Sequence, residues 1–387
     1  MSQREWGPIL EEETRRLIQN IIRTPSSYKE HINWQVAASP SSDISAADDR
    51  ERYLAMFMNR FTYGTPITEE RLKLAEELSV QTQKSLRPGY WIVDSVPLLA
   101  YLPEWLPGMG FKKWCRDARA HFDAFTVVPF RGALDSVRKG EVQEGMIPRG
   151  LQELLADKPT ADMDVLHSAA CSTHTAATET TSALLFSFIL LMTLHQDVQS
   201  RAYKEISDVV GTARLPLLSD LSSLPYINAI LKEVHRYHPA VSIVSRSPSE
   251  HDEYGGYFVP KGAWVIFNLW AITHDDTIYN DPDAFNPDRH LNLPEGVAYL
   301  DPRDVTFGLG KRICPGINLA NAQIALFMAQ VLSAFHITMP STDDNGAQNM
   351  PHLAYTPTFV SAPEPFTCCF SPRDDDFSQQ LLFASQL

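Results

Sequence analysis

One cysteine stands in a glycine-rich loop whose residue types suggest metal chemistry. The loop comprises residues 307–316, with the sequence FGLGKRICPG, and a helix is expected directly after it. Gly308 and Gly310 allow the backbone to fold back tightly, and Gly316 allows a flat ligand to approach closely. N–H groups at a helix N-terminus stabilise a thiolate, the form in which Cys314 would ligate a metal. For a bare Cys-Pro-Gly, a buried structural cysteine in a turn is the ordinary interpretation.

An acid and several threonines interrupt a long apolar segment at residues 176–181, which read AATETT. Threonines inside a helix bond back to main-chain carbonyls and can bend the helix. A carboxylate such as Glu179 is costly in apolar surroundings unless it is hydrated or used. The alternative interpretation is a polar face of a helix.

Several basic residues have spacings that suit carboxylate partners. Glu233 and Arg236 are three residues apart, so they lie on one face of a helix and can form an ion pair. Most such pairs are solvated and contribute little to stability. Arg246 and Arg312 could bind a carboxylate through two parallel hydrogen bonds, although an isolated arginine is more often a surface residue.

In combination, these segments resemble the cytochrome P-450 family. The cysteine loop matches the family pattern FxxGxRxCxG completely, Glu233 and Arg236 resemble its ExxR helix, and residues 176–181 resemble its (A/G)Gx(D/E)TT motif. The resemblance extends over about residues 8–373 and is greatest to fungal microsomal members. It implies a haem whose iron is ligated by the thiolate of Cys314.

The same resemblance assigns roles to the residues around the haem. Those implied to bind the cofactor beside Cys314 are Phe307, Gly310, Arg312, Gly316 and Arg246, the two arginines as partners of the haem propionates. Residues 285–289, FNPDR, resemble the family's later arginine-bearing loop. Glu233, Arg236 and Arg289 would then form a charge triad that holds the cysteine loop, a structural role whose loss should abolish haem binding. Asp288 stands where many relatives carry Glu.

The resemblance also implies an oxygen-activating pair and a substrate pocket. Thr180 would steady iron-bound dioxygen and Glu179 would relay protons, while Ala177 replaces the usual glycine, so that the helix bulge would be smaller. Apolar residues there could equally belong to the core, and they suggest only a lipophilic substrate. The implied pocket positions are Val241, Ile243, Val244, Thr358, Phe359 and Val360.

Composition excludes several other classes of protein. The chain has 387 residues, 44% of them hydrophobic, and a net charge of −14, which argues against a polyanionic partner such as nucleic acid. Five cysteines without CxxC spacing suit a reducing compartment better than a disulfide framework. We expect a mainly α-helical cytochrome P-450 fold with small β-sheets, forming a single domain over residues 1–387.

The N-terminal part of the family pattern is missing. The family's helix with a Trp-x-x-x-Arg pair has no counterpart, because Trp6 is followed four residues later by Leu10. The chain is therefore expected to begin just after that helix, without its first strands or membrane anchor. The apolar run 183–194 is too short to cross a bilayer. By resemblance the protein would lie at the endoplasmic reticulum surface, although a cytoplasmic location is also open for the chain as given.

Periodicity and turn residues predict the main elements. Helices are expected at residues 8–32, 66–86, 162–195, 225–238 and 317–335, and strands within 242–246, 256–260 and 263–269. The apolar positions of the last helix should form one stripe. Segment 87–111 is rich in Pro and aromatic residues, so it should cover a pocket, touch a membrane surface or pack in the core.

Three functions remain open at this stage. The first is a monooxygenase of secondary metabolism that takes electrons from an NADPH-dependent flavoprotein reductase, with Lys311 and Arg312 near the docking face. The second is a haem-thiolate enzyme that rearranges or dehydrates its substrate without hydroxylation. The third is a truncated, inactive paralogue that binds haem poorly or acts only through protein contacts.

Overall fold

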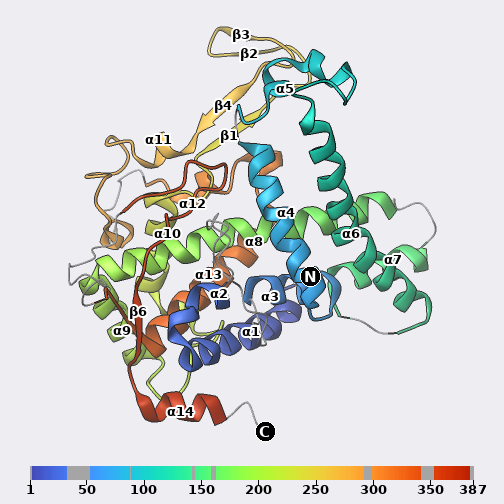
Figure 1. The fold of residues 1–387 in the computed structure, drawn as a ribbon. Coiled ribbons are helices and arrows are strands. Elements are labelled where there is room, and N and C mark those ends of the chain that lie inside the picture. Colours follow the sequence, from blue (N-terminus) through green and yellow to red (C-terminus); the bar gives the residue numbers. More distant parts are fainter. Residues whose placement is uncertain are drawn as a thin grey trace. The chain divides into compact units, whose positions relative to one another are not determined.

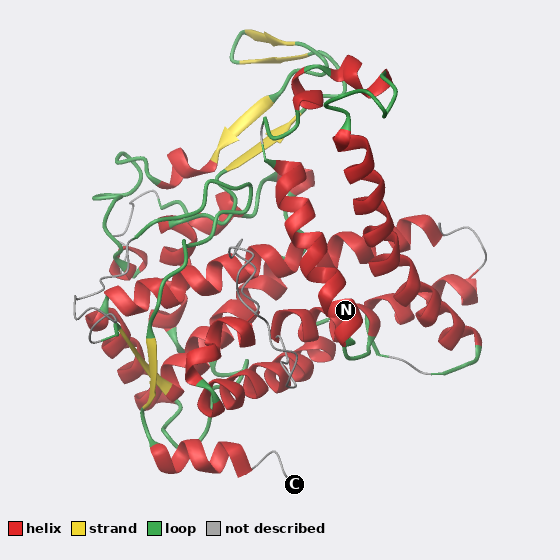
Figure 2. Ribbon diagram, viewed as in Figure 1, coloured by secondary structure: helices red, strands yellow, loops and turns green. Residues whose placement is uncertain are grey.

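The computed structural model describes residues 2–32, 53–87, 89–141, 144–157, 163–291, 299–340 and 353–383. These residues are mostly helical, with a few short strands (Figures 1 and 2). The mainly α-helical fold class is therefore confirmed. Contacts divide the chain into two compact units, residues 1–182 with 369–387, and residues 183–368.

The first unit contains helices from both ends of the chain. Helices α3, α6, α7 and α8 share a core formed by Tyr63, Phe130, Ile147, Leu151 and Ala170. Its elements are α1 (Gln3–Arg23), η1 (Pro25–Ser27), α2 (Tyr28–Ile32), α3 (Tyr53–Tyr63), α4 (Glu69–Leu86), α5 (Ile92–Ser95), η2 (Pro97–Tyr101), α6 (Gly110–Arg138), α7 (Met146–Asp157), the first part of α8 (Met163–Leu194), β6 (Cys369–Pro372) and α14 (Asp375–Phe383).

The second unit combines buried helices with two small antiparallel sheets of two strands each. Strand β1 pairs with β4, and β2 pairs with β3. Its elements are the end of α8, α9 (Gln196–Val209), η3 (Leu221–Ser223), α10 (Pro225–Tyr237), β1 (Ile243–Arg246), β2 (Asp252–Tyr254), β3 (Tyr257–Val259), β4 (Val265–Asn268), α11 (Leu269–Thr273), η4 (Pro287–His290), α12 (Pro302–Thr306), η5 (Gly310–Arg312), α13 (Ile317–Ala334) and β5 (Phe335–Thr338).

Helix α13 forms the centre of the second unit. The predicted positions Ile324, Phe327, Met328, Val331 and Phe335 are all fully buried. They do not form a stripe, however, because every residue from 323 to 335 is buried. From residue 323 onward the helix is therefore buried on every side, and the single-stripe expectation is wrong. A helix that is buried all round belongs to the interior of a large core.

Proline explains the helix bounds that the sequence predicted best. Helix α10 begins at Pro225, which suits a first helical position, and ends at Tyr237, two residues before Pro239. At the other end of the chain, the predicted helix 8–32 is divided. Helix α1 begins earlier, at Gln3, and a 3-10 turn at Pro25 separates it from α2. Segment 87–111 contains the short helical turns α5 and η2.

Two helices, α8 and α13, are long and apolar enough to span a bilayer by length and composition. The most apolar window of each helix is mostly buried inside the protein, 72% for α8 and 61% for α13. Buried core helices pass the same test, so these two helices are weak evidence for a membrane span. The apolar run 183–194 was expected to be too short to cross a bilayer. It is only part of α8, which has 32 residues and is long enough.

Candidate functional site

The cysteine loop closes on itself directly before α13. The main-chain N–H of Cys314 donates to the carbonyl oxygen of Phe307 at 2.8 Å. Gly308 and Gly310 adopt φ values of +77° and +61°, which an L side chain rarely tolerates. Gly316 is the N-cap residue of α13. The loop therefore places the thiol at the start of a buried helix.

The side chains around the thiol fit a flat apolar cofactor. Cys314 is free and half-buried. A Cβ added to Gly316 would lie 3.7 Å from the sulfur, so glycine leaves that side of the thiol open. Leu309 and Ile313, in the same loop, are 62% and 48% exposed. Exposed apolar side chains beside an accessible thiol are the surroundings that a thiolate-ligated haem requires.

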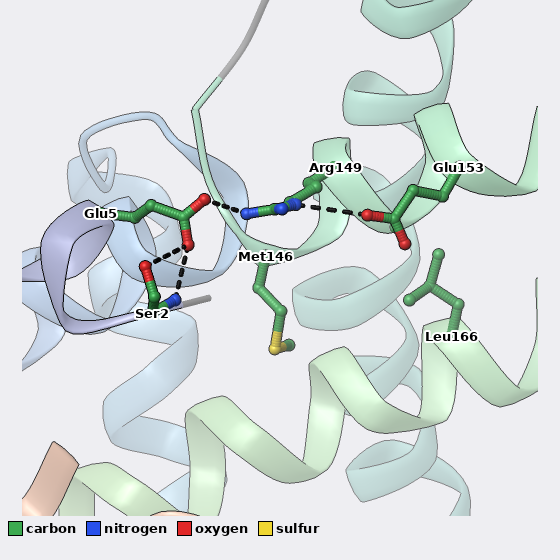
Figure 3. A pocket seen from close by; sticks show the side chains of 7 residues that line it. Ser2, Glu5, Met146, Arg149, Glu153 and Leu166 are labelled. Carbon is green, nitrogen blue, oxygen red and sulfur yellow. Dashed lines mark hydrogen bonds and ion pairs between the residues drawn. The ribbon is translucent and has the colours of Figure 1, made fainter. Parts of the chain in front are cut away.

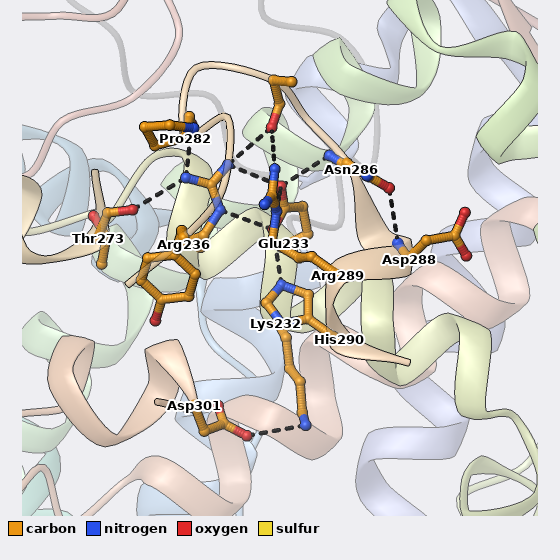
Figure 4. Close-up of polar contacts among 12 residues, drawn as sticks. Lys232, Glu233, Arg236, Thr273, Pro282, Asn286, Asp288, Arg289, His290 and Asp301 are labelled. Carbon is orange, nitrogen blue, oxygen red and sulfur yellow. Dashed lines mark hydrogen bonds and ion pairs between the residues drawn. The ribbon is translucent and has the colours of Figure 1, made fainter. Parts of the chain in front are cut away.

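Glu233 lies at the centre of a buried charge cluster (Figure 4). Both Glu233 and Arg236 are 0% exposed, so they do not form a solvated surface pair. Arg236 donates from Nε and Nη2 to the two carboxylate oxygens at 2.9 and 2.8 Å. Arg289 donates from Nε to one of them at 3.1 Å. The structure thus brings the three residues of the predicted triad into direct contact.

The remaining hydrogen bonds of the cluster make it rigid. The Asn286 main-chain N–H donates to Glu233 at 2.8 Å. Arg236 also donates to the carbonyl oxygens of Thr273, Pro282 and Ala284. Burial by itself would raise the pKa of Glu233, but hydrogen bonds from His290 and Arg236 outweigh it and hold that pKa below its usual value. Glu233 is therefore a charged, fully bonded carboxylate in the interior.

His290 is a member of this cluster that the sequence did not suggest. Its Nε2 lies 2.7 Å from the Glu233 carboxylate (Figure 4). Its Nδ1 lies 2.7 Å from the Tyr299 hydroxyl. A neutral imidazole that donates from Nε2 and accepts at Nδ1 satisfies both contacts. Asp288, by contrast, points away and pairs with Arg201. The one available signal was that His290 directly follows Arg289.

Helix α10 connects the charge cluster to the cysteine loop. Asp301, the N-cap of α12, pairs with Lys232 of α10 at 3.1 Å. The His235 ring lies 5.0 Å from the Phe307 ring, where the cysteine loop begins. Because α10 carries the cluster and touches both ends of α12, displacement of the cluster should disturb the loop that holds Cys314.

His290→Phe should weaken the cluster without removing its central charge. It deletes two hydrogen bonds, one of them to a buried carboxylate, so we expect a loss of about 2–4 kcal/mol in the free energy of unfolding. Denaturant titration of the purified chain measures this loss. His251→Phe is a matched control, because His251 is an exposed histidine of the same unit. Equal stabilities of the two variants would contradict the role assigned to His290.

The acid–threonine motif lies in the part of α8 that belongs to the first unit. The Thr180 hydroxyl donates to the Ala176 carbonyl at 2.8 Å. The Glu179 carboxylate accepts a hydrogen bond from Ser79 of α4 at 2.5 Å. Burial raises the pKa of Glu179, although the hydrogen bond from Ser79 opposes this. Helix α8 remains α-helical through Ala177, and Glu179 is directed at α4.

The structure also places the remaining predicted residues. Arg246, in β1, is exposed and donates to the Ser245 carbonyl, and Arg312, in η5, is exposed as well. Both side chains are therefore accessible to a carboxylate. The N–H of Ser361 donates to the Ala240 carbonyl, which brings the two predicted pocket segments together. None of the six is buried, so they are not core residues: Val241, Ile243, Val244, Thr358, Phe359 and Val360.

A hollow of about 470 Å³ in the first unit is not a convincing second site (Figure 3). Its only basic side chain, Arg149, forms ion pairs with both Glu5 and Glu153. Met146 and Leu166 form its apolar wall. Because the guanidinium is already neutralised from two sides, nothing in the lining selects a charged ligand.

Comparison with known proteins gives the family. The cytochrome P-450 family model matches residues 3–370. The cytochrome P-450 monooxygenase claR of Ampulloclitocybe clavipes is 34% identical over 95% of this chain and 66% of its own length. The cytochrome P-450 monooxygenase COX1 of Coprinopsis cinerea is 33% identical over 97% and 71%, respectively. A third relative, the cytochrome P-450 monooxygenase ppsD of Aspergillus oryzae, is 32% identical over 96% and 68%.

The chain belongs to the cytochrome P-450 family, a family of haem-binding oxidoreductases. It spans about two thirds of the length of these relatives. All three relatives are fungal monooxygenases by name, in agreement with the resemblance to fungal members seen in the sequence.

Proposed function

We propose that this chain acts as a haem-thiolate monooxygenase on a small lipophilic organic substrate, in fungal secondary metabolism. It would insert one atom of dioxygen into the substrate and release the other as water. An NADPH-dependent flavoprotein reductase would supply the two electrons. Relatives named as fungal monooxygenases support this proposal.

The observation that carries the proposal is the accessible thiol of Cys314 in its glycine-rich loop. Buried structural cysteines are surrounded by core side chains, whereas this one lies next to exposed Leu309 and Ile313. Helix α10 connects the loop to the buried Glu233 cluster. A buried cluster of charged groups is costly in free energy because its members lose their hydration. Such a cost is expected where a loop, here the cysteine loop, must be held in one geometry.

The residues of this chain would then have distinct tasks. A haem bound through Cys314 supplies the oxygen chemistry, because thiolate ligation favours cleavage of the O–O bond. Arg246 and Arg312 would bind its propionates through their exposed guanidinium groups. Phe307, Gly310 and Gly316 would shape the loop against the ring. Thr180 would hold a hydrogen bond at the oxygen side, and Glu179 would supply protons.

Two surfaces are proposed to bind partners. The exposed side chain of Lys311, next to Arg312 in the loop, would attract an acidic reductase to the loop face. Within segment 87–111, the side chains of Ile92, Leu98, Tyr101 and Trp105 are 73–85% exposed. Apolar and aromatic side chains exposed together suit the surface of the endoplasmic reticulum membrane. The pocket segments near residues 241–244 and 358–360 would contact the substrate.

Turnover in the presence of ¹⁸O-labelled dioxygen tests the reaction type. The purified chain would be supplied with NADPH, a fungal reductase and a panel of lipophilic substrates. We expect one labelled oxygen atom in the product and one in water. An oxidised or rearranged product without label would instead indicate a non-hydroxylating haem-thiolate enzyme. Absence of haem from the purified protein would indicate an inactive paralogue and contradict the proposal.

A further inference from the structure

A small, partly open cavity lies beside Glu179 in the first unit. Its volume is about 30 Å³, and it lies between α4 and α8 with contributions from α3 and α6. Ser79 from α4 reaches the Glu179 carboxylate there. The residues around the cavity are Ala55, Ala75, Leu78, Ser79, Phe125, His174, Thr175, Thr178 and Glu179.

His174 leaves a buried nitrogen atom without a partner at this cavity. The side chain is 3% exposed, and its Nε2 has no hydrogen-bond partner among the residues that the structure describes. The ring packs edge-on against Phe125 at 4.8 Å. Burial, together with the nearby charge of Arg71, lowers the pKa of His174 to about 3. The imidazole is therefore neutral, and an unpaired buried nitrogen is a costly feature that calls for a partner.

The size and polarity of the cavity suit a water molecule. A water needs at least about 10–15 Å³ of such space and two to four polar partners. Besides His174, the wall offers the hydroxyl oxygens of Thr175 and Thr178, which donate to carbonyls of their own helix and keep their lone pairs for another donor. Glu179 supplies the fourth polar group. An apolar ligand would leave His174 Nε2 without a hydrogen bond.

We propose that this cavity holds a bound water that joins His174 Nε2 to the Glu179 carboxyl group, and that Ser79 and His174 are positioning residues for that carboxyl group. Ser79 keeps it turned toward α4 by donating a hydrogen bond, and His174 anchors the water. When Glu179 gives up a proton, the water would return one by breaking its own O–H bond and would regain a proton from bulk water. This use of the water rests on the proposed function, whereas the water site itself does not.

A crystal structure of the full chain, with or without haem, tests the water site directly. We expect one ordered water within hydrogen-bond distance of His174 Nε2 and Glu179. Ala75→Leu should fill the cavity and displace it. A dry cavity in the wild-type protein would overturn the water site, whatever the protein catalyses.

Infrared titration tests the positioning role independently of catalysis. The carboxyl band of Glu179 is identified by its absence in Glu179→Gln. Ser79 donates to this carboxylate, His174 lines the same pocket, and the charge of Arg71 acts on His174. Ser79→Ala removes a hydrogen bond that lowers the pKa of Glu179, so the midpoint should move to higher pH. Ser85→Ala is the matched control, because Ser85 lies on the same helix and is exposed. An unchanged midpoint in Ser79→Ala would refute the role of Ser79.

The same variants separate this inference from the proposed function. In an active enzyme, product formed per NADPH should fall about tenfold in Ser79→Ala and Ala75→Leu, as expected for the loss of one hydrogen bond, and should be unaffected in Ser85→Ala. If the wild-type enzyme forms a hydroxylated product and coupling is the same in all variants, the relay is wrong and the proposed function stands.

Discussion

Glu233→Gln should lower the free energy of unfolding by about 3–5 kcal/mol, because it leaves the buried guanidinium of Arg236 without a counter-charge. Arg236 and Arg289 would remain close together after the substitution. The amide of Gln would also present a donor to His290 where an acceptor is needed. Because Glu233 is the shared partner of every basic group in the cluster, its loss should destabilise the protein more than the loss of His290.

Urea titration followed by circular dichroism measures the loss. Glu253→Gln is the matched control, because Glu253 is an exposed carboxylate of the same unit, and its effect should be below about 0.5 kcal/mol. Haem content after expression should fall in Glu233→Gln and remain unchanged in the control. Equal unfolding curves for the two variants would show that the cluster does not stabilise the second unit.

The stability of the wild-type protein should also depend on pH through this cluster. Both Glu233 and Asp301 have pKa values lowered in the folded protein, despite burial, by hydrogen bonds and charges from basic partners. The unfolded chain therefore binds more protons in acid, and stability is lost as pH falls below the ordinary carboxyl pKa of about 4. Glu233→Gln should flatten that part of the stability curve.

Glu179→Gln should reduce the rate of product formation by about 10²–10⁴-fold, the usual contribution of a positioned acid or base. Gln keeps the size of the side chain and can still accept from Ser79, but it cannot exchange a proton. Substrate binding, measured as the spectral change on titration, should remain within about twofold of wild type, because only proton delivery is lost.

Glu153→Gln is the control, since Glu153 is an exposed carboxylate of the same unit. Hydrogen peroxide released per NADPH should rise in Glu179→Gln alone. Electrons from NADPH that do not lead to product would instead reduce dioxygen to hydrogen peroxide. A variant that forms product at the wild-type rate would remove Glu179 from the mechanism.

The sequence predicted well those features that local rules determine. Pro225 and Pro239 limit α10 because proline suits a helix start and disfavours a helical residue before it. The tight turn at Gly308 and Gly310 could be predicted because glycine is the residue that adopts positive φ most easily, and both glycines do so. The same holds for α8, whose long apolar pattern gave nearly its observed bounds, Met163–Leu194.

Tertiary partners explain what the sequence could not predict. His290 contacts Glu233 although the two residues are 57 positions apart, and Tyr299 contacts His290 in turn. Ser79 and Glu179 are 100 residues apart, and no local pattern joins them. Strand β2 had no separate strand prediction, because its three residues, Asp252–Tyr254, are too few to show alternation of apolar and polar side chains.

The absorption spectrum of the reduced, CO-treated protein tests the central claim most directly, that the sulfur of Cys314 ligates a haem iron. The wild-type chain should show the strongly red-shifted band of a thiolate-ligated haem, and Cys369→Ser, which changes an exposed cysteine, should preserve it. Cys314→Ser should abolish that band. A wild-type protein that contains no haem, or a Cys314→Ser variant with an unchanged spectrum, would contradict the account.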